Sequence, residues 1–146
     1  MNVTIRKMQQ RDAEAVLAMM RLFYRSPAVL TDGSEEIFQN DVAACVGDSP
    51  YLEGFMMESA GEILGYAMIA KSFSTEFGKP CIWIEDLYVK DAYRHQGVGS
   101  AVLQHITGQF PGCLFRLEVE AENARAIDAY RKNGFRELPY MEMIIL

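Results

Sequence analysis

Two glycines, Gly97 and Gly99, lie between an apolar run and a segment with helical periodicity, and this order constrains the fold more than any other feature of the chain. The run over 81–89 has strand character. After it, apolar residues recur at the i, i+4 and i+8 spacing from Val98 to Ile106, which is typical of a helix packed along one side. The sequence therefore predicts a strand, a glycine loop and a helix in succession.

The glycine loop has the properties of an anion site. Glycine carries no Cβ, so a ligand can approach the backbone closely, and the N–H groups in the first turn of a helix favour a negative charge. A phosphate or pyrophosphate fits there. No Gly-Lys-Ser/Thr sequence follows, so this is not a Walker loop, and the third glycine and downstream acid of a dinucleotide-binding fingerprint are also absent. Because glycine also serves purely conformational roles in turns, the loop alone does not identify the ligand.

The rest of the chain alternates between strand and helix patterns. We expect strands over 3–6, 51–58, 63–72, 81–89 and 114–119, helices after Asp12, over 35–46, after the glycine loop and after Asn123, and a terminal strand or hairpin over 140–146. No linker or internal repeat is visible in the 146 residues, which are enough to bury a sizeable core. Residues 1–146 are therefore predicted to form a single domain of mixed α/β class.

The charge balance disfavours several kinds of partner. Fourteen Lys and Arg residues against 20 Asp and Glu residues give a net charge of −6, which argues against nucleic acid or anionic lipid and suits a cationic substrate. The three cysteines are far apart and match neither a disulfide framework nor a metal site. No signal-peptide core is visible, and no apolar run approaches the roughly 20 residues of a bilayer span. We therefore expect a cytoplasmic protein without metal.

Three ordered motifs resemble one enzyme family. Arg94, Gly97 and Gly99 fit the pattern R/Q-x-x-G-x-G/A. A second region fits N-x-x-A-x-x-x-Y-x-x-x-G-F through Asn123, Ala126, Tyr130, Gly134 and Phe135. The opening Ile5-Arg6 with Asp12, and Leu87-Tyr88-Val89, fit the remaining elements. With these residues, nearly the whole chain resembles the GNAT superfamily of acetyl-CoA-dependent N-acetyltransferases.

The resemblance implies both a fold and a cofactor site. The fold is a mixed, mostly antiparallel sheet of six to seven strands with about four helices, and its fourth and fifth strands splay apart to admit the pantetheine arm of acetyl-CoA. The implied acetyl-CoA contacts are Leu87, Tyr88, Val89, Arg94, His95, Gln96, Gly97, Val98, Gly99, Ser100, Asn123 and Tyr130. Members of this family also commonly form homodimers, and the terminal run 140–146 could pair between subunits or complete its own sheet.

Two residues are candidates for acid and base. Direct transfer needs a neutral amine and a proton for the departing thiolate, while a backbone N–H near 87–89 steadies the oxyanion. Tyr130 occupies the position of the motif tyrosine, which implies a general acid, although its spacing also fits a core tyrosine. Glu85, a charge within an apolar strand, is the candidate base, with a solvated strand face as the alternative. Asn123 fits either a helix cap or a cofactor contact.

The acceptor is predicted from the acids around this strand. The segment 82–94 resembles the diamine and polyamine branch of the family, in which carboxylates meet a cationic amine. The acceptor contacts expected on this basis are Glu35, Glu36, Glu85 and Asp86. Asp41, on the same predicted helix as Glu35 and Glu36, could also rim the acceptor cleft, with a solvated helix face as the alternative for all three. Glu85 and Asp86 should point to opposite faces of the strand unless a bulge intervenes. Acetylation of peptides or amino acids, and acyl-CoA sensing without catalysis, stay open as alternatives.

Overall fold

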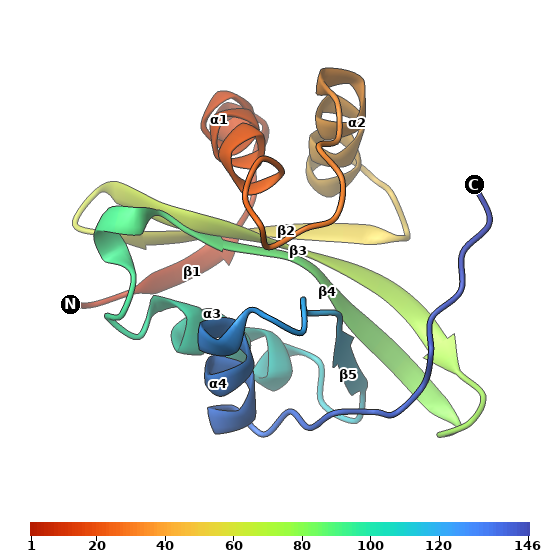
Figure 1. The fold of residues 1–146 in the computed structure, drawn as a ribbon. Helices are drawn as coiled ribbons and strands as arrows, with labels where there is room; N and C mark the ends of the chain where they lie inside the picture. Colours follow the sequence, from red (N-terminus) through yellow and green to blue (C-terminus); the bar gives the residue numbers. More distant parts are fainter.

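The computed structural model describes residues 1–146 as one five-stranded sheet with α1 and α2 on one face and α3 and α4 on the other (Figure 1). The elements are β1 (Thr4–Lys7), α1 (Ala13–Phe23), α2 (Glu35–Val46), β2 (Leu52–Ser59), β3 (Glu62–Ser74), β4 (Lys79–Val89), α3 (Val98–Gln109), β5 (Leu114–Leu117) and α4 (Ala124–Lys132). Short 3-10 turns at Gln10–Asp12 and Asp91–Tyr93 precede α1 and α3. The expected order of strands and helices is confirmed through α4.

The sheet changes character at its last strand. Its order is β1-β2-β3-β4-β5, with antiparallel pairing from β1 to β4. Strand β5 runs parallel to β4 but pairs only with Cys81–Ile84. Strand β4 continues to Val89, so its second half has no partner on the β5 side. This is the divergence that the family resemblance implies between the fourth and fifth strands.

The C-terminal segment corrects the expected strand count. The sheet has five strands instead of six to seven, and no strand follows α4. The predicted terminal strand over 140–146 was based on apolar content, but a strand also needs a neighbouring edge to satisfy its backbone groups. In the structure the segment leaves the sheet (Figure 1), and Leu146 and most of the preceding apolar residues are exposed. One anchor is the hydrogen bond that the Tyr140 hydroxyl donates to Glu76 in the β3–β4 turn.

Two apolar clusters pack against the two faces of the sheet. The first joins α1 and α2 to β2 and β3, and includes Met20, Phe38 and Tyr66. The second joins α3 to the opposite face, where Val102 and Ile106 contact the side chains of β3 and β4. No helix is long and apolar enough to cross a membrane.

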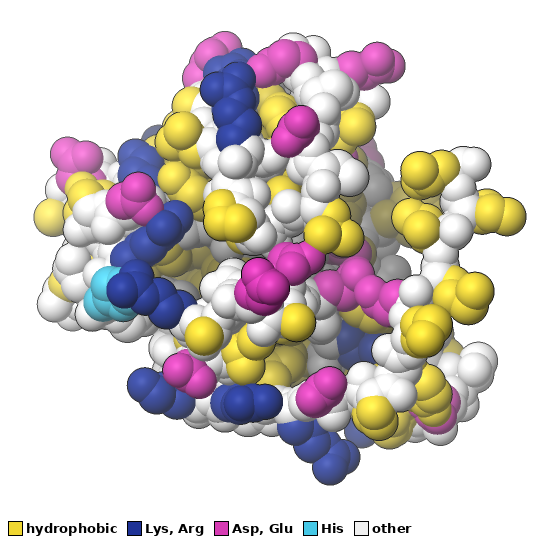
Figure 2. Space-filling model, viewed as in Figure 1, with side chains coloured by type: hydrophobic (Ala, Val, Ile, Leu, Met, Phe, Trp, Pro, Cys, Tyr) yellow, Lys and Arg dark blue, Asp and Glu magenta, His cyan; other side chains and the backbone are white.

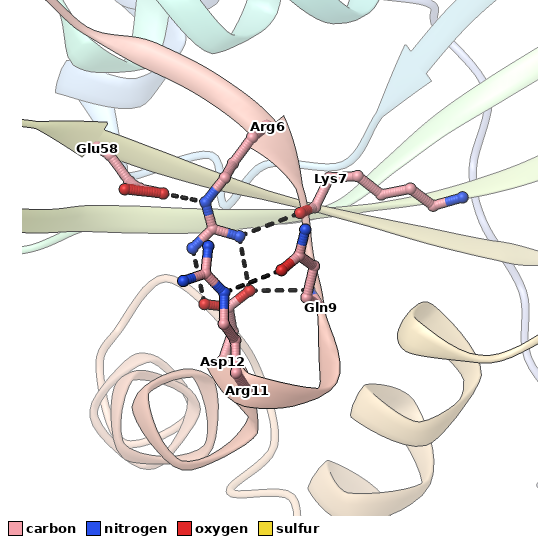
Figure 3. A network of polar contacts seen from close by, with 6 residues as sticks. All are labelled: Arg6, Lys7, Gln9, Arg11, Asp12 and Glu58. Atoms are coloured by element: carbon pink, nitrogen blue, oxygen red, sulfur yellow. Dashed lines mark hydrogen bonds and ion pairs between the residues drawn. The ribbon is translucent and has the colours of Figure 1, made fainter. Parts of the chain in front are cut away.

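A partly buried ion pair links the first strand to the first helix. The Arg6 guanidinium donates to both oxygens of Asp12, at 2.8 and 2.7 Å, and also bonds Glu58 on β2 (Figure 3). The backbone N–H of Gln9 donates to the same Asp12 carboxylate, which is buried. The guanidinium holds the pKa of Asp12 below its usual value. This network fixes where α1 begins relative to β1 and β2.

Gly65 lies on β3 at a point where the backbone of β4 leaves no room for a side chain. A Cβ built on Gly65 would lie 2.1 Å from the carbonyl oxygen of Tyr88, so a side chain there would push the second half of β4 away. We expect Gly65→Val to lower the free energy of unfolding by roughly 1–3 kcal/mol, the usual cost of overpacking. Denaturant titration beside Gly108→Val, a position in α3 with an ordinary helical backbone and no atom near its Cβ, would check this, and an equal loss in both variants would contradict it.

Candidate active site

The second half of β4 contains a β-bulge at Glu85. Pairing between β3 and β4 passes from Ile69 opposite Ile84 to Met68 opposite Asp86, so Glu85 has no partner on β3. Its side chain is exposed at the point where β5 no longer accompanies β4. The bulge that sequence reasoning left open is therefore present, and Glu85 is the extra residue.

Asp86, beside the bulge, lies in the core. It is only 4% exposed, and its two oxygens accept hydrogen bonds from Tyr24 at 2.9 Å and Tyr66 at 2.7 Å. Tyr24 directly follows α1, and Tyr66 lies on β3. Burial raises the pKa of Asp86, and the two hydroxyl donors oppose that effect. Both carboxylate oxygens thus have protein partners.

Four carboxyl groups besides Asp86 lie at or around the bulge. We call these four groups, together with Asp86 beneath them, the acidic face. They are Asp41 on α2, Glu85, Glu118 just after β5, and Glu142 in the C-terminal segment. Loss of water, followed by the charges of Asp86, Asp41 and Glu142, raises the pKa of Glu85. Burial and Asp86 raise the pKa of Asp41 to about 6, and the neighbouring Glu142 raises that of Glu118 to about 7. Figure 2 shows acidic side chains across the middle of the molecule, between α1 and α2 above and α3 and α4 below.

Two of the predicted acceptor residues on α2, Glu35 and Glu36, do not belong to the acidic face. Glu35 forms an ion pair with Arg21 of α1, with contacts of 2.5 and 3.0 Å. Glu36 is exposed beside it in the first turn. The acid of α2 whose charge reaches Glu85 is Asp41, half-buried further along the helix. The structure therefore brings Glu85 and Asp86 together and leaves Glu35 and Glu36 at the start of α2.

The open half of β4 also presents backbone groups. The N–H of Lys90 bonds to Leu64 on β3. Because backbone groups alternate in direction along a strand, those of Leu87 and Val89 point away from β3, toward the space that β5 has left. The side chain of Tyr88 is buried on the α1 and α2 face. Free N–H groups therefore line the gap between β4 and β5.

The glycine loop turns sharply before α3. His95 and Gly97 both have positive φ, +64° and +80°, and Cβ atoms at Gly97 and Gly99 would meet no atom within 4 Å. No side chain caps α3, so the N–H groups of its first turn, which begins at Val98 and continues through Ser100, are open. Arg94 donates to the carbonyl of Val89 and pairs with Asp91, and Gln96 bonds the carbonyl of Ala92. These two side chains hold the loop against the end of β4.

A hollow of about 550 Å³ lies between the loop and α4. His95 and Gly97 line it from the loop, and Ser100 lines it from α3. From α4 it is lined by two cations, Arg125 and Lys132, and by the carboxylate of Asp128. Arg125 contacts the His95 ring at 2.9 Å. Figure 2 shows a histidine with Lys or Arg side chains beside it at the left edge of the molecule. The hollow thus joins the open N–H groups of α3 to two cationic side chains.

Asn123 and Tyr130 are positioned by α4. The Asn123 side chain accepts from the N–H of Ala126, so the expected helix cap is present. Tyr130 is half-buried, packs edge-on against Phe135 at 6.0 Å between ring centroids, and joins the α3 cluster. Burial raises the pKa of its hydroxyl. A phenol with a raised pKa keeps its proton at neutral pH.

Comparison with known proteins now identifies the family. The model of the Acetyltransferase (GNAT) family matches residues 14–135. The chain belongs to the GNAT acetyltransferases. A Sus scrofa protein named thialysine N-epsilon-acetyltransferase is 31% identical to it, with 97% of this chain and 88% of that protein covered.

Solved structures share this GNAT fold. A possible acetyltransferase from Clostridium difficile 630 superposes with a TM-score of 0.84 at 18% identity, covering 99% of this chain and 97% of that one. AAC(6')-Iy in complex with the bisubstrate analogue CoA-S-monomethyl-acetylneamine gives 0.82 at 16% identity, covering 100% and 99%. At these identities the likeness establishes the fold alone. The family match and the curated relatives make this GNAT protein an acetyl-CoA-dependent N-acetyltransferase.

Sequence reasoning about this GNAT enzyme missed several side chains of the site. Tyr24 and Tyr66 read as core aromatics, and only the fold places their hydroxyls on Asp86. Glu118 carried a usable signal, because it lies near the carboxyl end of the strand predicted over 114–119. Strand β5 runs parallel to β4, and carboxyl ends of parallel strands share one edge.

Proposed function

We propose that this enzyme transfers the acetyl group of acetyl-CoA to the primary amine of a small acceptor that carries a second positive charge, with diamines and polyamines as the favoured class. The acidic face carries this proposal. Its carboxyl groups converge from four elements at the gap between β4 and β5. Such a concentration of negative charge favours a cationic ligand.

Glu85 is proposed as the base. A primary alkylamine is neutral in only about one molecule per thousand at pH 7, so a proton must leave before attack. Glu85 is exposed at the gap, and its raised pKa makes it a stronger base than an ordinary glutamate. It accepts this proton directly or through water, and the neutral nitrogen then bonds to the thioester carbonyl carbon.

Backbone groups and Tyr130 are proposed to complete the transfer. Acetyl-CoA supplies the activated thioester. The N–H groups of Leu87 and Val89 point into the gap, where they can stabilise the oxyanion that forms during attack. As the C–S bond breaks, Tyr130 donates its proton to the departing thiolate. The acetylated nitrogen then loses its remaining extra proton, which returns to the Tyr130 phenolate through solvent, and an N-acetyl amine and free CoA are left.

The loop and the hollow beside it fit the phosphate groups of CoA. The uncapped first turn of α3 and the bare surfaces of Gly97 and Gly99 leave room for a pyrophosphate against the backbone. The cations of Arg125 and Lys132 line the adjoining hollow. In a chain with a net charge of −6, this corner suits an anion.

The test is release of CoA thiol from acetyl-CoA with a panel of acceptors. The panel contains diamines, spermidine, thialysine, lysine, and peptides with a free lysine or a free N-terminus. Turnover that is fastest with diamines and polyamines supports the proposal. Turnover with peptides alone would overturn the acceptor class, and tight acetyl-CoA binding without turnover on any amine would favour a sensor.

An amino-acid acceptor is the second candidate. The 31% identical relative is named for thialysine, which carries an amine on its side chain. An amino-acid acceptor also carries a carboxylate, which the acidic face would repel unless a cation compensates. Comparing thialysine with the matched diamine lacking the carboxylate separates the two candidates.

Tyr130→Phe removes only the proposed acid. We expect kcat to fall by about 10- to 100-fold while the KM for acetyl-CoA changes less than about twofold, because the ring still packs on Phe135. Steady-state kinetics beside Tyr51→Phe, an exposed tyrosine outside the site, would check this. An unchanged kcat would assign Tyr130 to the core alone.

We also propose that the chain works as a single domain in the cytoplasm. In addition, we propose that it forms a homodimer through its C-terminal segment. Met141, Met143, Ile144, Ile145 and Leu146 are 83–111% exposed. An apolar surface of this kind favours a protein partner. Light scattering of the full chain and of a form ending at Leu138 would test the dimer.

A further inference from the structure

The bulge at Glu85 reverses the direction of the side chains along β4. Before it, Ile82 and Ile84 pack in the α3 cluster. After it, Leu87 and Val89 belong to that cluster, whereas Tyr88 packs in the α1 and α2 cluster. A regular strand would place residue 86 on the same face as 82 and 84. The extra residue therefore sends Asp86 to the α1 and α2 face, and Leu87 to the face of α3.

Asp86 is an unusual residue for the α1 and α2 face of the sheet. It is a buried carboxylate with no ion pair, and its partners are the two hydroxyls of Tyr24 and Tyr66. A buried carboxylate without a cation costs stability, and an apolar side chain would fill the same space without that cost. Its hydrogen bonds do join three elements, the end of α1, β3 and β4, at the residue that follows the bulge.

We infer that Asp86 is a positioning residue that, through its hydrogen bonds with Tyr24 and Tyr66, holds the bulge that presents Glu85 at the open half of β4. This inference rests on the proposed function, in which Glu85 is the base, and it changes the expected role of Asp86 from an acceptor contact to a support beneath the base. With both of its oxygens occupied, Asp86 acts through Glu85.

The charge of Asp86 adds a second effect on the same residue. Charged and titratable groups face Glu85 from β4 (Asp86), α2 (Asp41), the segment after β5 (Glu118) and the C-terminal segment (Glu142). Around Asp86 itself lie Tyr24, Tyr66, Asp41 and Cys45. The negative charge of Asp86 raises the pKa of Glu85, so its removal lowers that pKa and moves the acid limb of the pH profile to lower pH.

The experiment is a double-mutant cycle with Asp86→Asn and Glu85→Gln, measured as kcat and as the pH profile of kcat/KM with the best amine. Calorimetric titration with CoA counts the folded sites in each variant. Asp86→Asn is expected to keep full binding stoichiometry, to lower kcat at least about tenfold, and to shift the acid limb downward. In the Glu85→Gln background the same change should cost less than about twofold.

Controls separate the outcomes. Asp48→Asn, an exposed aspartate beyond α2, should change neither kcat nor the acid limb. If Asp86→Asn does not fold, Tyr24→Phe and Tyr66→Phe replace it in the cycle. Each is expected to lower kcat without moving the acid limb to lower pH.

The inference is overturned if the losses in kcat add in the double variant, or if Asp86→Asn leaves both the acid limb and kcat unchanged. A Glu85→Gln enzyme with full activity instead refutes the proposed base, and a wild-type enzyme without turnover refutes the proposed function.

Discussion

The Glu85→Gln variant is expected to bind acetyl-CoA normally. Its kcat should be about 10²- to 10⁴-fold lower than that of the wild type, because an amide cannot accept the proton of the amine. Glu85 forms none of the side-chain hydrogen bonds that hold the glycine loop, and its side chain is exposed, so the fold should tolerate the change. Thiol release under saturating acetyl-CoA gives kcat, and calorimetry gives the affinity.

The pH dependence of this loss has a definite sign. The carboxylate is the active form of the base, so activity is present above the pKa of Glu85 and is lost as pH falls through it. Partial loss of water in the gap and the neighbouring charges raise that pKa, which places the acid limb above the pH expected for an ordinary glutamate. Glu85→Gln should remove this limb, whereas Glu62→Gln, at the exposed start of β3, should keep it. A limb that persists in Glu85→Gln would place the base elsewhere.

Gly97→Val is expected to weaken CoA binding at least about 100-fold, or roughly 2.7 kcal/mol. The backbone of Gly97 has φ +80°, a conformation that side chains with a Cβ rarely adopt, and the added methyl groups would occupy the bare surface beside the first turn of α3. Equilibrium titration with CoA measures the loss without requiring turnover.

Two variants locate the cause of that loss. Gly97→Ala keeps most of the space and isolates the backbone strain, so its affinity should lie between those of Gly97→Val and the wild type. Gly108→Ala, near the other end of α3, has a helical backbone and no atom near its Cβ, and should bind CoA as the wild type does. Undiminished affinity of Gly97→Val would remove the loop from the cofactor site.

Local patterns in the sequence predicted most of the secondary structure. The helix over 35–46 is observed with the same bounds, because Ser34 caps it through the N–H of Ile37 and its buried residues recur at helical spacing. The hairpin between β2 and β3 also follows from local signals, with Ala60 and Gly61 both at positive φ in the turn. The expected strand at 140–146 was wrong because pairing depends on a partner edge that no local pattern describes.

By itself, the sequence determined the family, the order of elements through α4 and the position of the glycine loop, because caps, turns and periodicity act between residues close together in the chain. Only the tertiary structure decided that Glu85 is a bulged residue and that Asp86 lies beneath it between two tyrosines. It also decided that Glu35 forms an ion pair with Arg21. It also decided that Asp41 and Glu118 share the space around Glu85. These relations depend on strand register and on charges brought together from distant segments, and such through-space effects leave no periodic trace in a sequence.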